Sequence, residues 1–166
     1  MTEREKLLRR ARWWIGIFIV GLALSGVTAF PLESELRFAV KVCDHFAWVP
    51  VELSAWLHRV HDALADENVR YPFLAYGTDW LAFAHLMLAV LFIGPWRDPV
   101  RNKWVLAFGF IACASVLLLA LIAGPVRGIP FYWRLIDCSF GVFGTMVLWP
   151  AWKIVGQLET NATSGV

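Results

Sequence analysis

The sequence predicts an all-α integral membrane protein: a four-transmembrane-helix bundle with extracytoplasmic amphipathic helices between the first and second spans. Hydrophobic residues make up 59% and charged residues 17% of the 166 residues, against about 45–50% and about 25% in soluble domains. Four apolar stretches are long enough to cross a bilayer, and the ten tryptophans gather near their ends, where the membrane interface favours amphipathic rings. The length fits a single membrane domain.

The four spans follow from apolar length. A helix that crosses the hydrocarbon core needs about 20 mostly apolar residues. The first stretch follows a basic segment, but it is longer than the apolar core of a signal peptide, about 7–15 residues, so we expect it to remain as a span. Because proline lacks a backbone N–H, we expect Pro125 and Pro150 near span ends. The predicted spans cover residues of about 13–30, 79–96, 104–123 and 136–152.

The distribution of basic residues predicts the orientation of these spans. The N-terminal segment, the second connection and the C-terminal segment hold nine of the 15 lysines and arginines but only four of the 13 acidic residues. Because basic residues accumulate in short cytoplasmic segments, we expect both termini in the cytoplasm. The expected location is the plasma membrane, the inner membrane of a bacterium, with membrane lipids as neighbours and no nucleic-acid partner.

Residues 31–78 form the longest segment outside the predicted spans, and their pattern is helical. One helix is expected over about 36–49, and an apolar stripe recurs at helical spacing from Leu53 to Leu64. Helices of this amphipathic kind lie along the membrane interface or cover the end of a bundle. The segment is therefore predicted to be an extracytoplasmic helical cap, and Thr78 is expected to be the N-cap of the second span.

The polar face of the second outer helix raises a metal hypothesis. His58 stands three residues before His61 and four before Asp62, so a pair of these side chains can reach one ion, and Zn²⁺ takes three or four such ligands. A solvated polar face explains the same residues more simply. Asp44 with His45 could supply a further ligand, but only if the two outer helices pack together. A divalent metal is the cofactor that these residues suggest, and the cofactor is otherwise unknown.

The three cysteines form no CxxC pair, so the motif of a thiol–disulfide oxidoreductase is missing. Cys113 lies in the middle of the third predicted span, where we expect it to serve as packing. Cys43 and Cys138 lie on the predicted outer side. A disulfide between them is allowed but not required, since the sequence does not fix the Cα separation that a bridge needs.

Three ionisable residues lie inside or at the edge of predicted spans, where such groups are costly and commonly functional. Asp79 and Asp137 are each expected to open a helix on the outer side, where the positive end of the helix dipole stabilises a carboxylate. Both aspartates are otherwise explained as simple helix-terminal charges. His85 lies six residues after Asp79. It is either a proton-transfer group or a neutral side chain hydrogen-bonded to a neighbouring helix.

The connection between the third and fourth spans, GPVRGIPFYWRLID, carries two arginines, although arginines have no topological role on the outer side. Arg134 precedes Asp137 by three residues, so the two can pair on one helix. Tyr132 and Trp133 are expected to anchor the connection at the interface. That anchoring would direct Arg127 and Arg134 inward.

Together these features predict a polar pocket at the outer end of the bundle. Gly141 and Gly144 form a flat stripe that accepts another helix or the tail of a lipid- or quinone-like amphiphile. His85 and Asp79 are the catalytic candidates, as proton-transfer groups. The candidates for binding the ligand's head group are Arg127, Arg134, Asp137, Trp133 and Tyr132.

Other functions stay open, and the residues do not decide whether the protein is an enzyme. One alternative is a non-catalytic assembly or regulatory subunit, whose charges are structural and which binds a membrane partner subunit or a second copy of itself. Another is a metal-binding membrane protein that uses the helical cap. A transporter is less well supported, because helix breaks and polar residues at mid-membrane depth are largely missing. No nucleotide-binding loop, nucleophile elbow, HExxH or c-type haem motif occurs.

Overall fold

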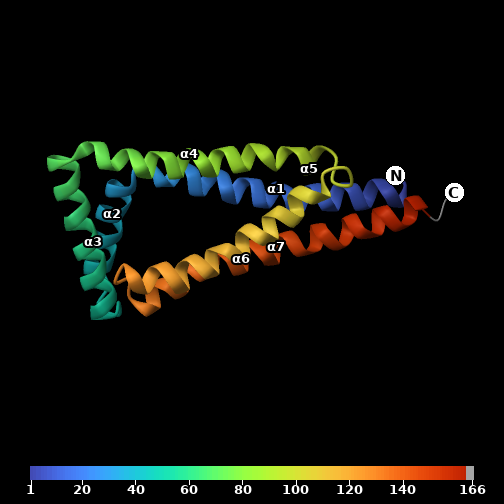
Figure 1. The fold of residues 1–166 in the computed structure, drawn as a ribbon. Helices are drawn as coiled ribbons and strands as arrows, with labels where there is room; N and C mark the ends of the chain where they lie inside the picture. Colours follow the sequence, from blue (N-terminus) through green and yellow to red (C-terminus); the bar gives the residue numbers. More distant parts are fainter. Residues whose placement is uncertain (164–166) are drawn as a thin grey trace. The chain divides into compact units, whose positions relative to one another are not determined.

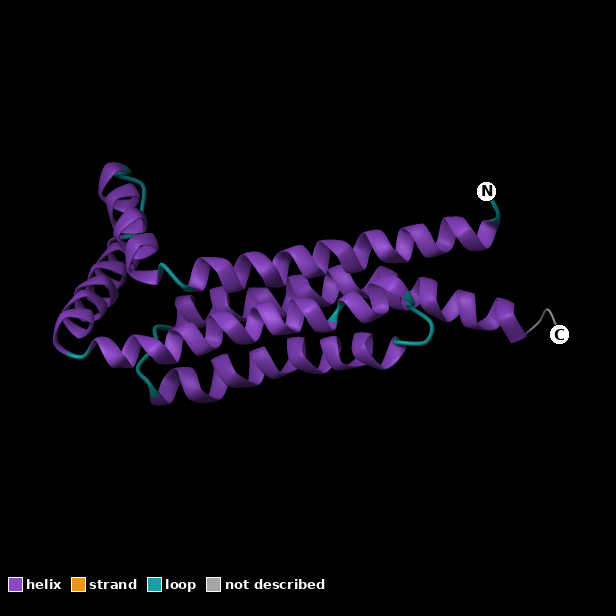
Figure 2. Cartoon of the chain, turned by 90° about the horizontal axis from the view of Figure 1, so that it is seen from above, coloured by secondary structure: helices purple, strands orange, loops and turns teal. Residues whose placement is uncertain are grey.

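The computed structural model describes residues 1–163, and nearly all of them are helical (Figure 1, Figure 2). Helix accounts for 88% of the structure, and no strand occurs among the described residues. Figure 2 shows the helices joined by short loops. In chain order the elements are α1 (Glu3–Ala29), α2 (Leu32–His45), α3 (Val51–Arg70), η1 (Pro72–Ala75), α4 (Tyr76–Leu91), α5 (Ile93–Arg97), α6 (Lys103–Val126) and α7 (Phe131–Thr163).

Four helical segments are long and apolar enough to cross a membrane, as the sequence predicts. The third has a mean hydropathy of 2.8, against 1.3 to 1.5 for the other three, in agreement with its prediction as the most uniformly apolar run. The four segments are α1, the run Pro72–Arg97 that joins η1, α4 and α5, the whole of α6, and Phe131–Asn161 of α7.

The first of these helices extends well beyond its predicted span. α1 starts at Glu3, within the basic segment. Thr2 and Glu5 form a capping box there: the Thr2 N–H donates to Glu5 Oε2 at 2.7 Å, and the Glu5 N–H donates to Thr2 Oγ1 at 3.2 Å. Because Lys, Arg and Glu are good helix formers, the charges that exclude this segment from a membrane core do not end the helix.

Some local predictions fail. Asp137 does not open a helix, because α7 starts at Phe131 and Asp137 lies in its second turn. Thr78 is not an N-cap, because α4 starts before it. Pro125 lies in the last turn of α6, close to the expected end, whereas Pro150 lies in the interior of α7. The missing N–H of Pro150 removes one helical hydrogen bond, but the helix continues.

The chain divides into two compact units, which are described separately. One consists of Met1–Gly21 with Ala89–Val166, and the other of Leu22–Leu88. The first unit therefore holds the start of α1 together with α5, α6 and α7, and the second holds α2, α3 and most of α4.

In the first unit, α6 and α7 make the most extensive helix pairing of the chain. Glycines let the two backbones approach. A Cβ atom on Gly109 would lie 2.6 Å from Leu148 Cδ1, and one on Gly144 would lie 2.7 Å from Cys113 Sγ. A Cβ atom on Gly141 would collide with the carbonyl oxygen of Cys113. Helix α6 therefore lies directly against the glycine stripe of α7, which is the helix-packing role allowed by the sequence.

The best-packed part of this unit lies where α1, α5, α6 and the second half of α7 meet. The rings of Phe18 and Phe92 lie 4.7 Å apart, centre to centre. Lys103 at the start of α6 forms an ion pair with Glu159 of α7. Among the residues whose burial the structure describes, the largest fully buried side chains all belong to this unit: Phe92, Ile15, Leu106, Leu148, Val105, Val155, Pro95 and Pro99.

In the second unit, α2 and α3 pack as an antiparallel hairpin. Its buried residues are few: Leu36 and Val40 of α2 and Leu57 of α3. The two helices confirm the helical pattern predicted for residues 31–78, although the first covers Leu32–His45 rather than about 36–49. Polar contacts link the two helices near both ends of the hairpin.

Candidate functional site

The connection between α6 and α7 is a tight turn with a specific hydrogen-bond pattern. Gly128 adopts a φ of 69°, and its N–H donates to the Pro125 oxygen at 3.1 Å. The Ile129 N–H donates to the Gly124 oxygen at 2.9 Å. This is a Schellman motif, which requires a left-handed residue and so favours glycine. The turn brings the first residues of α7 beside the last turn of α6, and it leaves Arg127 exposed at the helix end.

Arg134 of α7 lies against the backbone of α6. A Cβ atom on Gly124 would lie 2.5 Å from Arg134 Cδ, so the glycine leaves room for the arginine side chain. The guanidinium carbon lies 5.2 Å from the centre of the Phe131 ring, within the range of a cation–π contact. Arg134 Nε is buried and has no hydrogen-bond partner in the described part of the chain. An unsatisfied buried donor costs about 1–3 kcal/mol, so this position favours an incoming acceptor.

The other candidates of this turn are arranged differently from the prediction. No ion pair joins Arg134 to Asp137, although both residues are described. Asp137, Trp133 and Tyr132 are partly buried, and Tyr132 interacts with other residues of the structure. The structure thus brings Arg134 to α6 and the Phe131 ring, and the expected Arg–Asp pair is absent.

Asp79 and His85 both lie on α4, in the second unit. Asp79 occupies the first turn of α4, in agreement with its prediction as a charge near a helix N-terminus. His85 Nδ1 lies 2.8 Å from the carbonyl oxygen of Leu81. In the neutral side chain Nδ1–H therefore donates to the backbone of its own helix, rather than to a neighbouring helix. The role of Asp79 and His85 in proton transfer stays a prediction.

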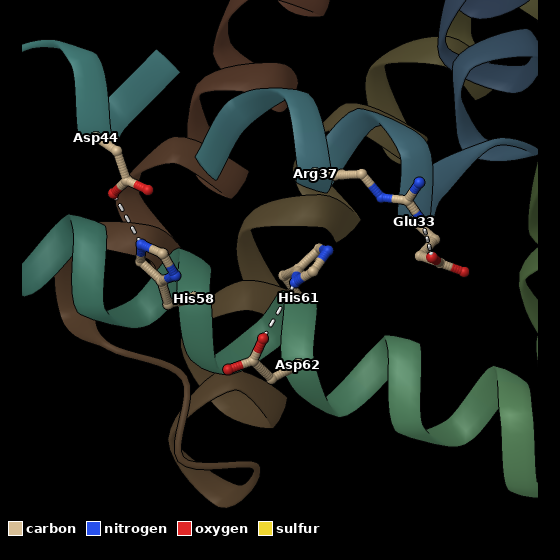
Figure 3. A network of polar contacts seen from close by, with 6 residues as sticks. All are labelled: Glu33, Arg37, Asp44, His58, His61 and Asp62. Atoms are coloured by element: carbon tan, nitrogen blue, oxygen red, sulfur yellow. Dashed lines mark hydrogen bonds and ion pairs between the residues drawn. The ribbon is translucent and has the colours of Figure 1, made fainter. Parts of the chain in front are cut away.

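A network of polar contacts crosses the α2–α3 hairpin (Figure 3). His58 Nε2 lies 2.9 Å from Asp44 Oδ1, which links the end of α2 to α3. His61 Nδ1 lies 3.1 Å from Oδ1 of the adjacent Asp62, and His61 Nε2 is buried without a hydrogen-bond partner among the described residues. Helices α2 and α3 do pack together, which is the condition under which Asp44 with His45 could supply a further metal ligand.

At the other end of the hairpin, the carboxylate of Glu33 accepts two hydrogen bonds. Asn68 Nδ2 donates to Oε2 at 2.8 Å, and Arg37 Nη2 donates to Oε1 at 2.5 Å (Figure 3 shows the second). Both bonds stabilise the charged form. The Asn68 bond, and after it the Arg37 bond, therefore hold the pKa of Glu33 below its ordinary value. Asn68 lies on α3, so this contact ties the start of α2 to the end of α3.

The hairpin does not gather a set of metal ligands. Within residues 1–163, no group of three or more His, Cys, Asp or Glu side chains is placed so that it would hold an ion. His58 and His61 instead contact different carboxylates. Cys43, Cys113 and Cys138 are free thiols.

A groove that the sequence prediction missed lies along α1. It has a volume of about 470 Å³. Its α1 members recur at spacings of three and four residues, so helical periodicity groups them on one face. Trp96, however, comes from the end of α5, and only the fold brings it there. The lining residues are Glu5, Leu8, Arg9, Arg12, Trp13 and Trp96.

The α6–α7 turn suits recognition of an acceptor group. It presents one exposed guanidinium, that of Arg127, and one that is held against α6, that of Arg134. Guanidinium groups bind carboxylate and phosphate oxygens through a planar set of donors. Comparison with known proteins adds no family to this description: the chain matches no protein-family model, no curated protein and no solved structure.

Proposed function

We propose that the chain is an integral membrane protein whose four apolar helices span the bilayer, with both termini in the cytoplasm and α2 and α3 outside. Large apolar side chains support insertion, because they stay exposed along α6 and α7: Leu119 is 66%, Ile122 67% and Phe140 66% exposed. Transfer of such a side chain from water to an apolar environment is favourable by about 1.5–3 kcal/mol, and lipid tails provide that environment. The excess of basic residues in the terminal segments supports the orientation.

The protein binds a lipid- or quinone-like amphiphile at the α6–α7 turn, with Arg134 and Arg127 holding the polar head. The observation that carries this function is the buried Nε of Arg134, which lacks an acceptor within the described residues. A head-group oxygen at this position would accept the free N–H and meet the positive charge of the guanidinium. The exposed apolar faces of α6 and α7 provide a surface for the tail.

The charge at the turn favours a head group that is anionic or strongly accepting. Asp137 follows Arg134 on the same helix but makes no ion pair with it, so the guanidinium is not neutralised there. Hydrogen bonds to an ionised oxygen are roughly twice as strong as neutral ones, and they gain further strength where water is scarce. A phosphate or carboxylate head is therefore expected to bind more tightly than a neutral quinone carbonyl.

Native mass spectrometry of the detergent-extracted protein tests this function. The wild type is expected to retain a co-purified amphiphile, and Arg134→Gln is expected to lose most of it, because glutamine lacks the positive charge and the planar set of guanidinium donors. Arg101→Gln is the matched control, since it removes the same charge from an exposed position in the other connection of this unit. Equal retention by the two variants would overturn the proposal.

The competing function is a non-catalytic assembly or regulatory subunit, in which Arg134 only stabilises the α6–α7 turn. The contacts with Gly124 and with the Phe131 ring favour this function, because they hold the side chain without a ligand. In that case the wild type retains no amphiphile, and Arg134→Gln lowers the thermal unfolding midpoint in detergent. Mass spectra and thermal unfolding of the same preparations therefore separate the two functions.

A further inference from the structure

The groove along α1 has two arginines among its walls, and they differ in what they contact. The guanidinium of Arg12 makes two hydrogen bonds to backbone oxygens: its Nε donates to the Trp96 carbonyl oxygen at 3.1 Å, and its Nη2 donates to the Arg97 carbonyl oxygen at 2.8 Å. These carbonyls end α5 and have no partner within that helix. The Arg12 side chain therefore holds α1 and α5 together and fixes one wall of the groove.

Arg9 is the cation of the groove that is left for a ligand. It makes no ion pair or hydrogen bond within residues 1–163. Glu5, four residues before it, is the obvious candidate partner on a helix. Its carboxylate instead accepts the Thr2 N–H in the capping box, at 2.7 Å. The guanidinium of Arg9 therefore lines the groove without an ion pair, although the Glu5 carboxylate lines the same groove.

Two tryptophans form the apolar side of the same groove. Trp13 follows Arg9 by one turn and is 65% exposed, and Trp96 is 44% exposed. The Trp96 indole is positioned by α1, since a Cβ atom on Gly16 would lie 3.7 Å from its Nε1. Tryptophan side chains favour the depth of lipid head groups, where the ring meets acyl chains and the N–H meets water or phosphate.

We infer that this groove binds the head group of an anionic phospholipid in the cytoplasmic leaflet. Arg9 pairs with the lipid phosphate, and Trp13 and Trp96 cover the glycerol and the first acyl carbons. The inference rests on the membrane insertion proposed above, but not on the amphiphile site at Arg134.

The surrounding charge selects an anionic lipid over a zwitterionic one. Residues 1–21 carry five basic and two acidic side chains, and one of the five, Lys6, already pairs with Glu3 at 2.5 Å. The ammonium of a phosphatidylcholine head would meet this positive field unfavourably, whereas a phosphatidylglycerol head adds no positive charge.

The test distinguishes specific lipid binding in the groove from general electrostatic attraction of anionic lipid, by comparing two neighbouring arginines. Arg9→Gln and Arg10→Gln change the net charge equally, and both positions are exposed, but only Arg9 lines the groove. Full-length protein in detergent is titrated with phosphatidylglycerol or with phosphatidylcholine, and bound lipid is counted by native mass spectrometry. Arg9→Gln is expected to weaken phosphatidylglycerol binding about tenfold, the equivalent of about 1.4 kcal/mol, because it removes a direct charge-assisted hydrogen bond to the lipid phosphate, while Arg10→Gln stays close to the wild type.

Equal losses in the two variants would show diffuse attraction and overturn the site. So would wild-type binding of phosphatidylcholine as tight as that of phosphatidylglycerol. Quenching of tryptophan fluorescence by phosphatidylglycerol with brominated acyl chains gives a second readout, and it is expected to fall in Arg9→Gln but not in Arg10→Gln.

Failure of the membrane proposal has a different signature. Alkaline carbonate would then release every variant from the membrane fraction, whatever its lipid binding. Failure of the amphiphile site alone would leave phosphatidylglycerol binding at Arg9 intact, and Arg134→Gln is expected to show the wild-type value in this titration.

Discussion

The α6–α7 pair and the α2–α3 hairpin are each two helices packed side by side, but different contacts hold them together. In α6–α7, glycines bring the helix backbones together, as at Gly141 against the carbonyl oxygen of Cys113. In α2–α3, side chains reach across instead, through the Glu33–Asn68 and Asp44–His58 contacts. The first pair depends on the absence of side chains, and the second on the chemistry of particular ones.

This difference determines how strongly the stability of each helix pair depends on pH and salt. The backbone contact of α6 and α7 at Gly141 involves no charged side chain and is expected to change little with pH or salt, and the Lys103–Glu159 ion pair is the salt-sensitive contact between these helices. Exposed polar contacts are individually weak, are screened by salt and depend on protonation. The hairpin also has few buried apolar residues, so we expect it to open locally before the α6–α7 pair does.

The largest expected effect comes from adding one methyl group to the close-packed pair. In Gly141→Ala the new Cβ would collide with a backbone oxygen of α6, which side-chain movement cannot relieve, so we expect a loss of about 1–3 kcal/mol in unfolding free energy. Gly156→Ala on the same helix is the control, because a Cβ there meets no atom within 4 Å. Thermal unfolding in detergent measures both, and a Gly141→Ala protein as stable as Gly156→Ala would contradict the close approach.

A smaller effect is expected where the hairpin is linked by side chains. Asp44→Ala removes the contact to His58, and since both side chains are about half exposed, at 53% and 43%, the loss should be about 0.2–1 kcal/mol. Asp66→Ala is the matched control, because Asp66 pairs with Arg70 on the same helix and does not link α2 to α3. Hydrogen exchange of the α2 amides is expected to rise in Asp44→Ala and to stay unchanged in Asp66→Ala.

The smallest effect is a dependence on pH at the other end of the hairpin. The pKa of Glu33 is lowered from its ordinary value of 4.5, so the Asn68 bond stabilises the fold above that pH and loses its effect as the pH falls through the lowered value. Asn68→Ala should therefore be less stable than the wild type at neutral pH. This difference in stability between the wild type and Asn68→Ala should vanish in acid. Thermal unfolding followed by tryptophan fluorescence at several pH values measures it. A difference that persists below the pKa would mean that Asn68 acts through packing.

Patterns that repeat along the chain were predictable from the sequence. Apolar length identified the four span-like helices, and the spacing from Leu53 to Leu64 identified α3. Prolines were a less reliable guide to where helices end. Pro150 does not end its helix, since α7 continues to Thr163, because one missing hydrogen bond does not outweigh good helix formers and packing on both sides.

Contacts between distant residues were not predictable in the same way. Adjacent charges suggested an Arg134–Asp137 pair, but the side chain of Arg134 lies over Gly124, a glycine of the preceding helix whose role depends on the Schellman turn. Arg12 donates to carbonyl groups of α5. Because every residue carries a backbone carbonyl, the sequence does not indicate which one an arginine will contact. Sequence therefore identified which residues were unusual but not what they contact.

The length of α7 has a practical consequence. Its 33 residues extend for about 50 Å at about 1.5 Å per residue, whereas the hydrocarbon core is about 30 Å thick. In the proposed orientation the part of α7 that follows the predicted span extends into the cytoplasm, and Glu159, near its end, pairs with Lys103 at the start of α6. A fluorescent protein fused to this end would be carried clear of the bilayer, and its distance from the lipid surface, read by energy transfer, would report how deeply the helix is seated.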